Sequence, residues 1–369
     1  MKRNGVKRIG FVSGLLFAAF VLSFTGDARA DFTFGEPTNL GPGINTSVED
    51  GGISLSPDGL ELYLSSFLDG FGLGTFRRAT RETTEDSWGE AIGLEPPFKR
   101  IVGSCISADG LQLYFDSDRA GGSGGADIWM ATRASTSGPW ENPVNLGPRV
   151  NSHDWELGPS ISADGLELYF GSSRSGGSGD WDVWVCTRAT VADPWSKAVN
   201  VGPAVNSSTY DGQPFISANG LMLFTSSDRT GGYGDWDIWM ARRSSKDDDW
   251  SRLTNLGAML NSEAGEAEPF LSSDEKTLYF SDWWIPRDGG CGINDVWQVS
   301  VDPVVDLNTD GIVDLADLMM LVDNWGTDDS LYDIGPTPWG DGVVDAQDLL
   351  VLAQYMVQSA ADVNDVNDL

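Results

Sequence analysis

A segment of about 55 residues repeats along most of this 369-residue chain, and it constrains the fold more than any other feature. Each copy centres on a run such as SISADGLELYF, which begins at Ser160. The turn residues of successive copies are 51, 55, 55 and 55 positions apart: Asp58, Asp109, Asp164, Asn219 and Asp274. A chain built in this way buries apolar surface by packing neighbouring copies together, so the repeat is also the structural unit.

The pattern of each copy predicts four short strands. Runs such as LELYF alternate with the period of a half-buried strand. In four of the five copies an Asp-Gly or Asn-Gly pair separates the first two strands and favours a type I′ hairpin, in which both central residues have positive φ. A glycine-rich loop, an Asp-Ile/Val-Trp strand and a segment ending in Asn-Leu/Val-Gly follow. Four-stranded units repeated around a ring are typical of a β-propeller.

The two ends of the repeat region indicate how such a ring closes. Residues 31–302 hold five copies, which predicts an all-β, five-bladed β-propeller. The segment Phe34–Gly41 is similar to the fourth-strand segment Trp140–Gly147, but no blade precedes it. The last copy, which ends near Ser300, has three strands and lacks a fourth. We therefore expect the N-terminal strand to complete the fifth blade.

The motifs S-x-D-G-L-x-L-Y-F and D-I-W-x-A resemble those of TolB-like and WD-repeat-like propeller proteins. The resemblance covers most of residues 34–300 and implies the propeller fold. It implies little about activity, because one fold carries many functions. Relatives with this repeat often have six blades, whereas this sequence holds five copies.

The N-terminus has the features of an export signal. Four basic residues flank and precede an apolar stretch from Ile9 to Phe24, and an Ala-Arg-Ala cleavage site follows at residues 28–30. We expect residues 1–30 to be a signal peptide and the mature protein to be secreted, at the cell surface or in the periplasm. The apolar stretch is shorter than the ~20 residues of a spanning helix, so we expect no transmembrane anchor after cleavage. The formal charge of −32 disfavours nucleic acid as a partner.

Acidic residues precede the first strand of four copies and are candidate ligand-binding residues: Asp50, Glu156, Asp211 and Glu266. First strands line the central channel of a propeller. These carboxylates therefore either ring the channel mouth, as a site for a cation or polar ligand, or make a repeated hydrogen bond that fixes a loop. Both interpretations stay open. Trp181 and Trp236, in glycine-rich loops, are further ligand-binding candidates, because aromatic faces stack on sugar rings.

Besides a purely structural role in a surface assembly, two kinds of function fit this arrangement. The first is non-catalytic recognition of a polysaccharide or a protein. The second is catalysis by a five-bladed glycoside hydrolase of the arabinanase type, which needs two carboxyl groups ~5–9 Å apart in distinct roles. The candidate acids are equivalent by repeat and none has a distinct context, so the sequence predicts recognition, with no catalytic residue assigned. A Ser/His/Asp triad does not fit a chain with one histidine, His153.

Beyond residue 302 the pattern changes to that of a calcium loop. In DLNTDGIVDLAD, residues 306–317, side-chain oxygens fall at loop positions 1, 3, 5, 9 and 12, and Gly311 stands at position 6, where the loop turns sharply. A main-chain carbonyl fills position 7. The expected ligands are Asp306, Asn308, Asp310, Ile312 through its carbonyl, Asp314 and Asp317.

A second loop repeats the D-G-x-V-D-x-x-D part of the first. Its expected ligands are Asp341, Val343 through its carbonyl, Asp345 and Asp348. Counting back places Thr337 and Trp339, which carry no carboxylate, at positions 1 and 3; Asp333 supplies the first ligand if residues 334–340 bulge outward.

Two such loops, each followed by a helix, resemble a type I dockerin at residues 303–358, with an acidic tail at 359–369. The resemblance implies a small all-α, EF-hand-like domain that needs calcium to fold. It also implies attachment of the protein to a cohesin-type partner.

Overall fold

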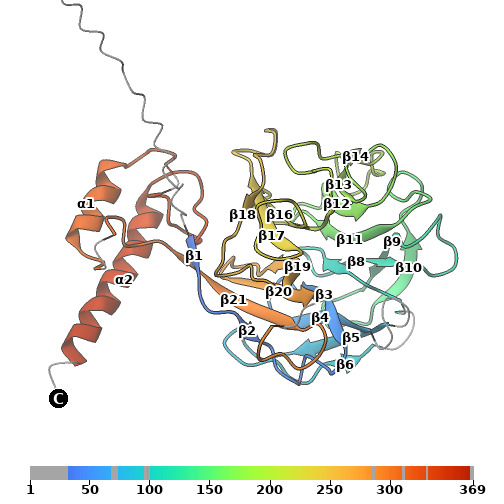
Figure 1. The fold of residues 1–369 in the computed structure, drawn as a ribbon, viewed down its shortest axis with the longest axis horizontal. Coiled ribbons are helices and arrows are strands. Elements are labelled where there is room, and N and C mark those ends of the chain that lie inside the picture. The colour runs from blue at the N-terminus through green and yellow to red at the C-terminus, as the bar shows by residue number, and fades with distance from the viewer. Residues whose placement is uncertain are drawn as a thin grey trace, which may run out of the picture.

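The computed structural model describes residues 32–67, 74–94, 98, 100–283, 287–309, 312–329 and 331–365, with side chains described as far as residue 356. The chain forms a ring of β-sheets with a pair of helices beside it (Figure 1). The expected signal peptide, residues 1–30, and the expected calcium ligand Asp310 lie outside the described residues. Within the described ranges, no helix is long and apolar enough to cross a membrane.

Five antiparallel sheets form the five blades, which confirms the expected propeller. The first two blades consist of β3 (Glu49–Leu55), β4 (Glu61–Phe67), β5 (Gly74–Thr80) and β6 (Ile92–Gly93), then β7 (Ser104–Ile106), β8 (Gln112–Ser117), β9 (Asp127–Thr132) and β10 (Glu141–Asn145). The next two consist of β11 (Glu156–Ile161), β12 (Glu167–Ser172), β13 (Asp182–Thr187) and β14 (Val199–Asn200), then β15 (Asp211–Ile216), β16 (Met222–Ser227), β17 (Asp237–Arg242) and β18 (Thr254–Asn255). The inner strands contact one another in sequence, and the innermost strand of the last blade contacts β3, so the ring is closed.

The fifth blade joins the two ends of the repeat region. It consists of β19 (Gly265–Leu271), β20 (Thr277–Trp283), β21 (Val296–Pro303) and, as its outer strand, β2 (Thr38–Asn39). A further N-terminal strand, β1 (Phe32–Phe34), pairs with the far end of β21. The expectation that the N-terminal segment completes the last blade is therefore confirmed.

The turn between the first and second strands of each blade differs from the expected type I′ hairpin. In the first blade Gly59 has a φ of +70°, whereas Asp58 is not in the positive-φ region. The carboxylate of Asp58 accepts hydrogen bonds from the Ser56 hydroxyl and the Leu60 amide, at 2.5 and 3.1 Å. The aspartate thus closes the turn with its side chain, and only the glycine has to adopt the left-handed conformation.

Large apolar side chains pack between neighbouring blades. One cluster joins Tyr63 and Phe76 of the first blade to Phe115 and Trp129 of the second, and the Tyr63 hydroxyl accepts a 3.1 Å hydrogen bond from Trp140. The tryptophan of each Asp-Ile/Val-Trp strand is buried, as expected for a core residue: Trp129, Trp184, Trp239 and Trp297. The repeat therefore encodes the contact between blades as well as the blade.

The C-terminal module (residues 304–365) follows β21 and contains the helices α1 (Leu315–Asp323) and α2 (Ala346–Asp365). Its own core consists of Val305, Leu307, Leu321, Ile334, Val344 and Leu352. Helix α2 continues through Asp365 and so includes most of the expected tail, because no glycine or proline interrupts its sequence. The module lies beside β1 and β21 (Figure 1).

Candidate ligand chamber and calcium loops

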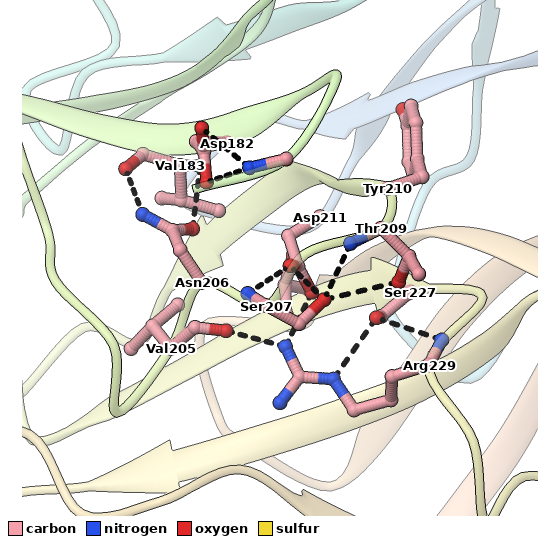
Figure 2. A network of polar contacts seen from close by, with 12 residues as sticks. Asp182, Val183, Val205, Asn206, Ser207, Thr209, Tyr210, Asp211, Ser227 and Arg229 are labelled. Atoms are coloured by element: carbon pink, nitrogen blue, oxygen red, sulfur yellow. Dashed lines mark hydrogen bonds and ion pairs between the residues drawn. The ribbon is translucent and has the colours of Figure 1, made fainter. Parts of the chain in front are cut away.

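The four repeated acids expected at the channel mouth are buried structural groups. Figure 2 shows Asp211, which has no exposed surface and accepts hydrogen bonds from the amide and hydroxyl of Ser207, at 2.5 and 2.7 Å. Arg229 forms an ion pair with the other carboxylate oxygen and also donates to the Val205 carbonyl. The next side chain, Tyr210, points away from this network. Every oxygen of Asp211 is thus engaged within the protein.

The same network recurs in three other blades. Asp50, Glu156 and Glu266 have no exposed surface, and each accepts hydrogen bonds from the amide and hydroxyl of the residue four positions earlier. Each also pairs with an arginine, at 3.5, 2.9 and 2.8 Å respectively: Arg77, Arg174 and Arg287. The assignment of these four acids as ligand-binding residues is therefore corrected, because they fix the loop that enters the first strand of each blade.

The second blade lacks this acid and carries a different buried carboxylate. Ile101 stands at the repeated position, and Asp116 stands in β8, where other blades have serine or glycine. Asp116 accepts hydrogen bonds from the amides of Val102 and Gly103, at 2.8 and 3.0 Å, and from the Gly158 amide of the next blade, at 2.8 Å. It therefore ties the second blade to the third.

Burial raises the pKa of Asp116 from 3.8 to about 7, although the three backbone amides oppose the shift. The unfolded chain then ionises first as the pH rises, so the contribution of Asp116 to stability is fully present below about pH 4 and is lost as the pH rises to about 7. We expect this group to reduce the free energy of unfolding by up to about 4 kcal/mol over that range. Urea unfolding of the wild type and of Asp116→Asn between pH 4 and 8 measures the effect, which should be absent from the variant. The same pH dependence in both proteins would contradict it.

A chamber of about 260 Å³ opens at the start of the inner strands, where Trp181 and Trp236 both line it. Two further aromatic side chains, Tyr210 and Trp283, line it as well. Tyr210 stacks on Trp236 with ring centroids 4.4 Å apart and planes at 10°, and Trp236 lies nearly parallel to Trp283 at 6.1 Å. Trp181 is 6.0 Å from Tyr210. The two tryptophans chosen from sequence are therefore half of a continuous aromatic row.

Two polar side chains enter the chamber from strained backbone positions. Gln213 and Glu268 occupy the same repeat position as Gly52 and Gly158, and all four residues have positive φ. The position lies at a β-bulge in the inner strand, where a side chain costs about 1–3 kcal/mol of strain. Sequence reasoning missed this pair, although aligning the copies at residues 52, 103, 158, 213 and 268 reads Gly, Gly, Gly, Gln, Glu.

Glu268 is held in one orientation. One carboxylate oxygen accepts hydrogen bonds from the Gly52 amide and the Ser281 hydroxyl, at 2.5 and 2.8 Å. The other oxygen lies 3.4 Å from the side-chain amide of Gln213. Burial raises the pKa of Glu268, opposed by the hydrogen bonds from Gly52 and Ser281. Among the described residues that line the chamber, Glu268 is the one with an ionisable carboxyl group.

Apolar side chains lie between the chamber and the other end of the channel. Cys105, Phe215 and Phe270 line both the chamber and a smaller cavity of about 100 Å³ at the opposite end of the channel. The rings of Phe215 and Phe270 are in contact, with centroids 4.6 Å apart. A ligand therefore enters the chamber from one side and meets an apolar floor.

The first of the two expected calcium loops is organised around Asp317, which is fully buried. One of its oxygens accepts hydrogen bonds from the amides of Leu307 and Asn308, at 2.7 and 3.1 Å, and the other from the Asp314 amide, at 2.8 Å. Asp314 in turn caps α1 through the Ala316 amide. The remaining donors, carboxylate and amide oxygens with the Ile312 carbonyl, are the hard ligands that calcium prefers.

The second loop repeats this organisation with Asp333 as its first residue. Asp348 accepts hydrogen bonds from the amides of Ile334, Gly335 and Asp345, at 2.6, 2.8 and 2.6 Å, which matches Asp317 in the first loop. Asp333 accepts from the amides of Asp341 and Gly342, at 2.9 and 2.6 Å.

This arrangement gives a register different from the one obtained by counting back along the sequence. Asp333 takes position 1 and Gly335 position 3, and the insert, residues 336–340, stands where the first loop has a single residue. Thr337 and Trp339 are therefore not at ligand positions. Asp333 is thus the first residue of the loop, as in the alternative with an outward bulge, but the extra segment is shorter than the expected 334–340. That Asp333 is a calcium ligand stays a prediction. The oxygen donors of both loops suit calcium, with no side-chain ligand at position 3 of the second. Within the described part of the chain, which excludes Asp310, no three acidic side chains converge on one point.

The known proteins to which this chain is similar are solved structures. No known family model matches the chain, and no curated protein matches it in sequence. Among solved structures, a protein of Agrobacterium tumefaciens described as TolB is 17% identical, with 74% of this chain and 86% of that chain covered and a TM-score of 0.44. A thermostable family-43 glycoside hydrolase is 15% identical, with 72% and 93% covered and a TM-score of 0.48.

An α-L-arabinofuranosidase from Podospora anserina is 12% identical, with 74% of this chain and 97% of that chain covered and a TM-score of 0.47. Identities and TM-scores this low carry no information about the chemistry of the chamber.

Proposed function

We propose that this protein is an exported, non-catalytic binding protein whose chamber holds a carbohydrate. The observation that carries the proposal is the aromatic row of Trp181, Tyr210, Trp236 and Trp283 along a chamber that is otherwise mainly apolar. Aromatic faces stack on the apolar faces of sugar rings, and a few fixed polar groups then set orientation. Gln213 and Glu268 supply those groups at the chamber wall.

The size of the chamber limits the ligand. A volume of about 260 Å³ is at the lower end of small-ligand sites. The floor of Cys105, Phe215 and Phe270 lies between the chamber and the smaller cavity, and we expect it to block the passage of a chain. We therefore propose that the chamber takes a small saccharide or the terminal residue of a glycan rather than an internal stretch of a polysaccharide.

We favour binding over hydrolysis because the carboxyl groups in and near the chamber do not form the pair that a glycosidase needs. A glycosidase of the five-bladed class needs an acid and a second carboxylate on either side of the scissile bond. Glu268 lines the chamber, whereas Asp116 is fully buried and does not line it. The four repeated acids are engaged in ion pairs. The alternative, a tethered glycoside hydrolase, would have to use Glu268 together with a group from outside the described lining.

The C-terminal module is proposed to bind calcium and to attach the protein to a cohesin-type partner. The loop residues Asp306, Asn308, Asp314 and Asp317, with the Ile312 carbonyl, would hold the ion in the first half, together with Asp310. Calcium bound there would supply folding energy, because the unfolded chain has no preformed site. The matching hydrogen bonds of Asp317 and Asp348 support the proposal that the two loops are related.

Substitution of the central aromatic side chain tests the carbohydrate proposal. We expect the full-length protein to bind members of a glycan array, and Trp236→Ala to weaken the tightest interaction at least about tenfold, or ~1.4 kcal/mol. Trp155→Ala is the matched control, because Trp155 is exposed and does not line the chamber. Equal losses in both variants, or no glycan bound by the wild type, would contradict the proposal. Release of sugar from a bound glycan that disappears in Glu268→Gln would support the hydrolase alternative instead.

A further inference from the structure

Trp339 belongs to the C-terminal module in sequence but is buried in the propeller. It is 4% exposed and is part of the apolar cluster between the fourth and fifth blades. Its ring centroid lies 4.1 Å from that of Phe32, 6.3 Å from Phe34 and 5.5 Å from Phe224. Its indole nitrogen donates a 3.0 Å hydrogen bond to the carbonyl of Glu275, in the turn between β19 and β20. The module is thus anchored to the propeller by a side chain whose polar atom is also satisfied.

Trp339, the anchoring residue, belongs to the insert in the second calcium loop, residues 336–340. At one end of the insert, Gly340 has a φ of +75° and lies against Asp333, where an added Cβ atom would come 2.4 Å from the carboxyl carbon. Asp333 itself accepts the amides of Asp341 and Gly342, directly after the insert. The side chain at loop position 1 and the anchored tryptophan are therefore parts of one compact turn.

A cavity of about 300 Å³ lies at the junction between the propeller and the module. It is lined on the propeller side by Met222, Arg242 and Arg243 and on the module side by Asp333, Trp339 and Asp341, among others. The expected ligands of the second loop thus face the junction with the propeller. The first loop has no comparable insert, since Asn308 and Asp310 are separated by one residue.

We infer that Trp339 is a positioning residue for the second calcium loop, and that the propeller serves as part of the scaffold of that site. The inference rests on the proposed calcium binding. With Trp339 buried in the propeller, residues 336–340 are held outward and Asp333 reaches position 1. Without that anchor, the insert separates position 1 from the rest of the loop by a flexible segment, and ordering it opposes binding.

The linkage acts in both directions. If anchoring Trp339 raises the calcium affinity of the second loop, then calcium at the second loop must stabilise the anchored arrangement by the same factor. Typical coupling between two sites corresponds to about 5–150-fold in affinity. Calcium is then expected to raise the melting temperature of the propeller as well as that of the module.

Calcium titration calorimetry on the full-length chain tests the inference. Asp306→Ala disables the first loop, so that the second can be measured alone. We expect Asp306→Ala/Trp339→Ala to bind calcium at least about tenfold more weakly than Asp306→Ala. Trp339→Phe in the same background should restore most of the calcium affinity, because phenylalanine can pack in the same apolar cluster between the fourth and fifth blades. Trp325→Ala is the control for loss of a tryptophan, since Trp325 is half exposed in the first half of the module.

The melting temperature of the propeller with and without calcium gives a second measurement. Calcium should raise it in Asp306→Ala and should leave it unchanged in Asp306→Ala/Trp339→Ala. Equal calcium affinities in these two variants would overturn the inference, as would the absence of calcium binding by Asp306→Ala when the wild type binds one ion. In that last case the proposed calcium site in the first loop stands. Failure of the wild type to bind calcium would overturn the calcium proposal and this inference together.

Discussion

Removal of residues 32–46 is expected to lower the melting temperature by more than about 10 °C and to broaden the unfolding transition. These residues form the outer edge of the fifth blade, where β2 pairs with β21. Without them β21 becomes an open edge and the ring of blades is no longer held shut.

The expected size of the effect follows from the interactions that these residues make. Asn45 exchanges two hydrogen bonds with the backbone of Val296, at 2.8 and 3.0 Å, and Ile44 is fully buried. Phe32 and Phe34 are buried in the same cluster as Trp339. Deleting a buried aromatic side chain costs about 3–5 kcal/mol, and a typical protein is stable by about 5–15 kcal/mol in total.

Differential scanning calorimetry of the shortened chain measures this effect. Val199→Pro is the matched control, because it disrupts β14, the outer strand of another blade, without opening the ring. The control should lose less stability and keep a single sharp transition. A shortened chain that melts cooperatively at the wild-type temperature would show that the N-terminal segment does not close the propeller.

Asp211→Ala is expected to reduce the free energy of unfolding by about 3–5 kcal/mol, because it leaves the Arg229 charge without its buried partner. The side chain of Arg229 is 17% exposed, so solvent replaces the missing interaction only in part. The amide and hydroxyl of Ser207 lose their acceptor as well. Replacing both members of the pair should cost less than the sum of the single changes.

Urea unfolding of the two single variants and the double variant measures the coupling between Asp211 and Arg229. Lys246→Ala is the matched control. Lys246 forms an ion pair with Asp164 of the neighbouring blade, and both side chains are more than one third exposed. It should cost less than about 1 kcal/mol. A similar loss in the control and in Asp211→Ala would mean that burial does not strengthen the repeated pair.

The propeller could be predicted from the sequence because its repeat encodes strands, turns and contacts between blades together. Positions such as Tyr63 and Trp129 recur at fixed spacing, so the same local pattern specifies each interface. The closing strand was also predictable, since Phe34–Gly41 repeats a fourth strand. Agreement between these local signals explains why the blade number could be read from the sequence.

The candidate site was predicted only in part, for two physical reasons. A repeated acid such as Asp211 can face either the channel or the protein interior, and periodicity does not distinguish the two. The decisive difference is the arginine partner, which stands 18 residues away in sequence. Trp181 and Trp236 were identified because they depart from the core pattern, and Trp283 also stands outside the repeat. Tyr210 joins them only when separate blades come together.

Trp339 illustrates a different limit. Counting along the second loop places it at a ligand position that it cannot fill, because counting assumes a loop of standard length. In the structure the loop begins at Asp333, and Trp339, one of the extra residues, is buried in the propeller. An insert that binds a distant part of the chain leaves no periodic signal, so its role depends on the tertiary structure.

The positions of the chamber and the anchor determine how an attached molecule would face its surroundings. The strand β19 carries Glu268 at the chamber end, and the chain then reaches Glu275, whose carbonyl binds Trp339, at the other end. A partner bound to the module, as we propose, would therefore be attached near the end of the inner strands that lies away from the chamber mouth. If both proposals are correct, attachment and ligand binding would use different parts of the surface, so a tethered copy could still bind its ligand.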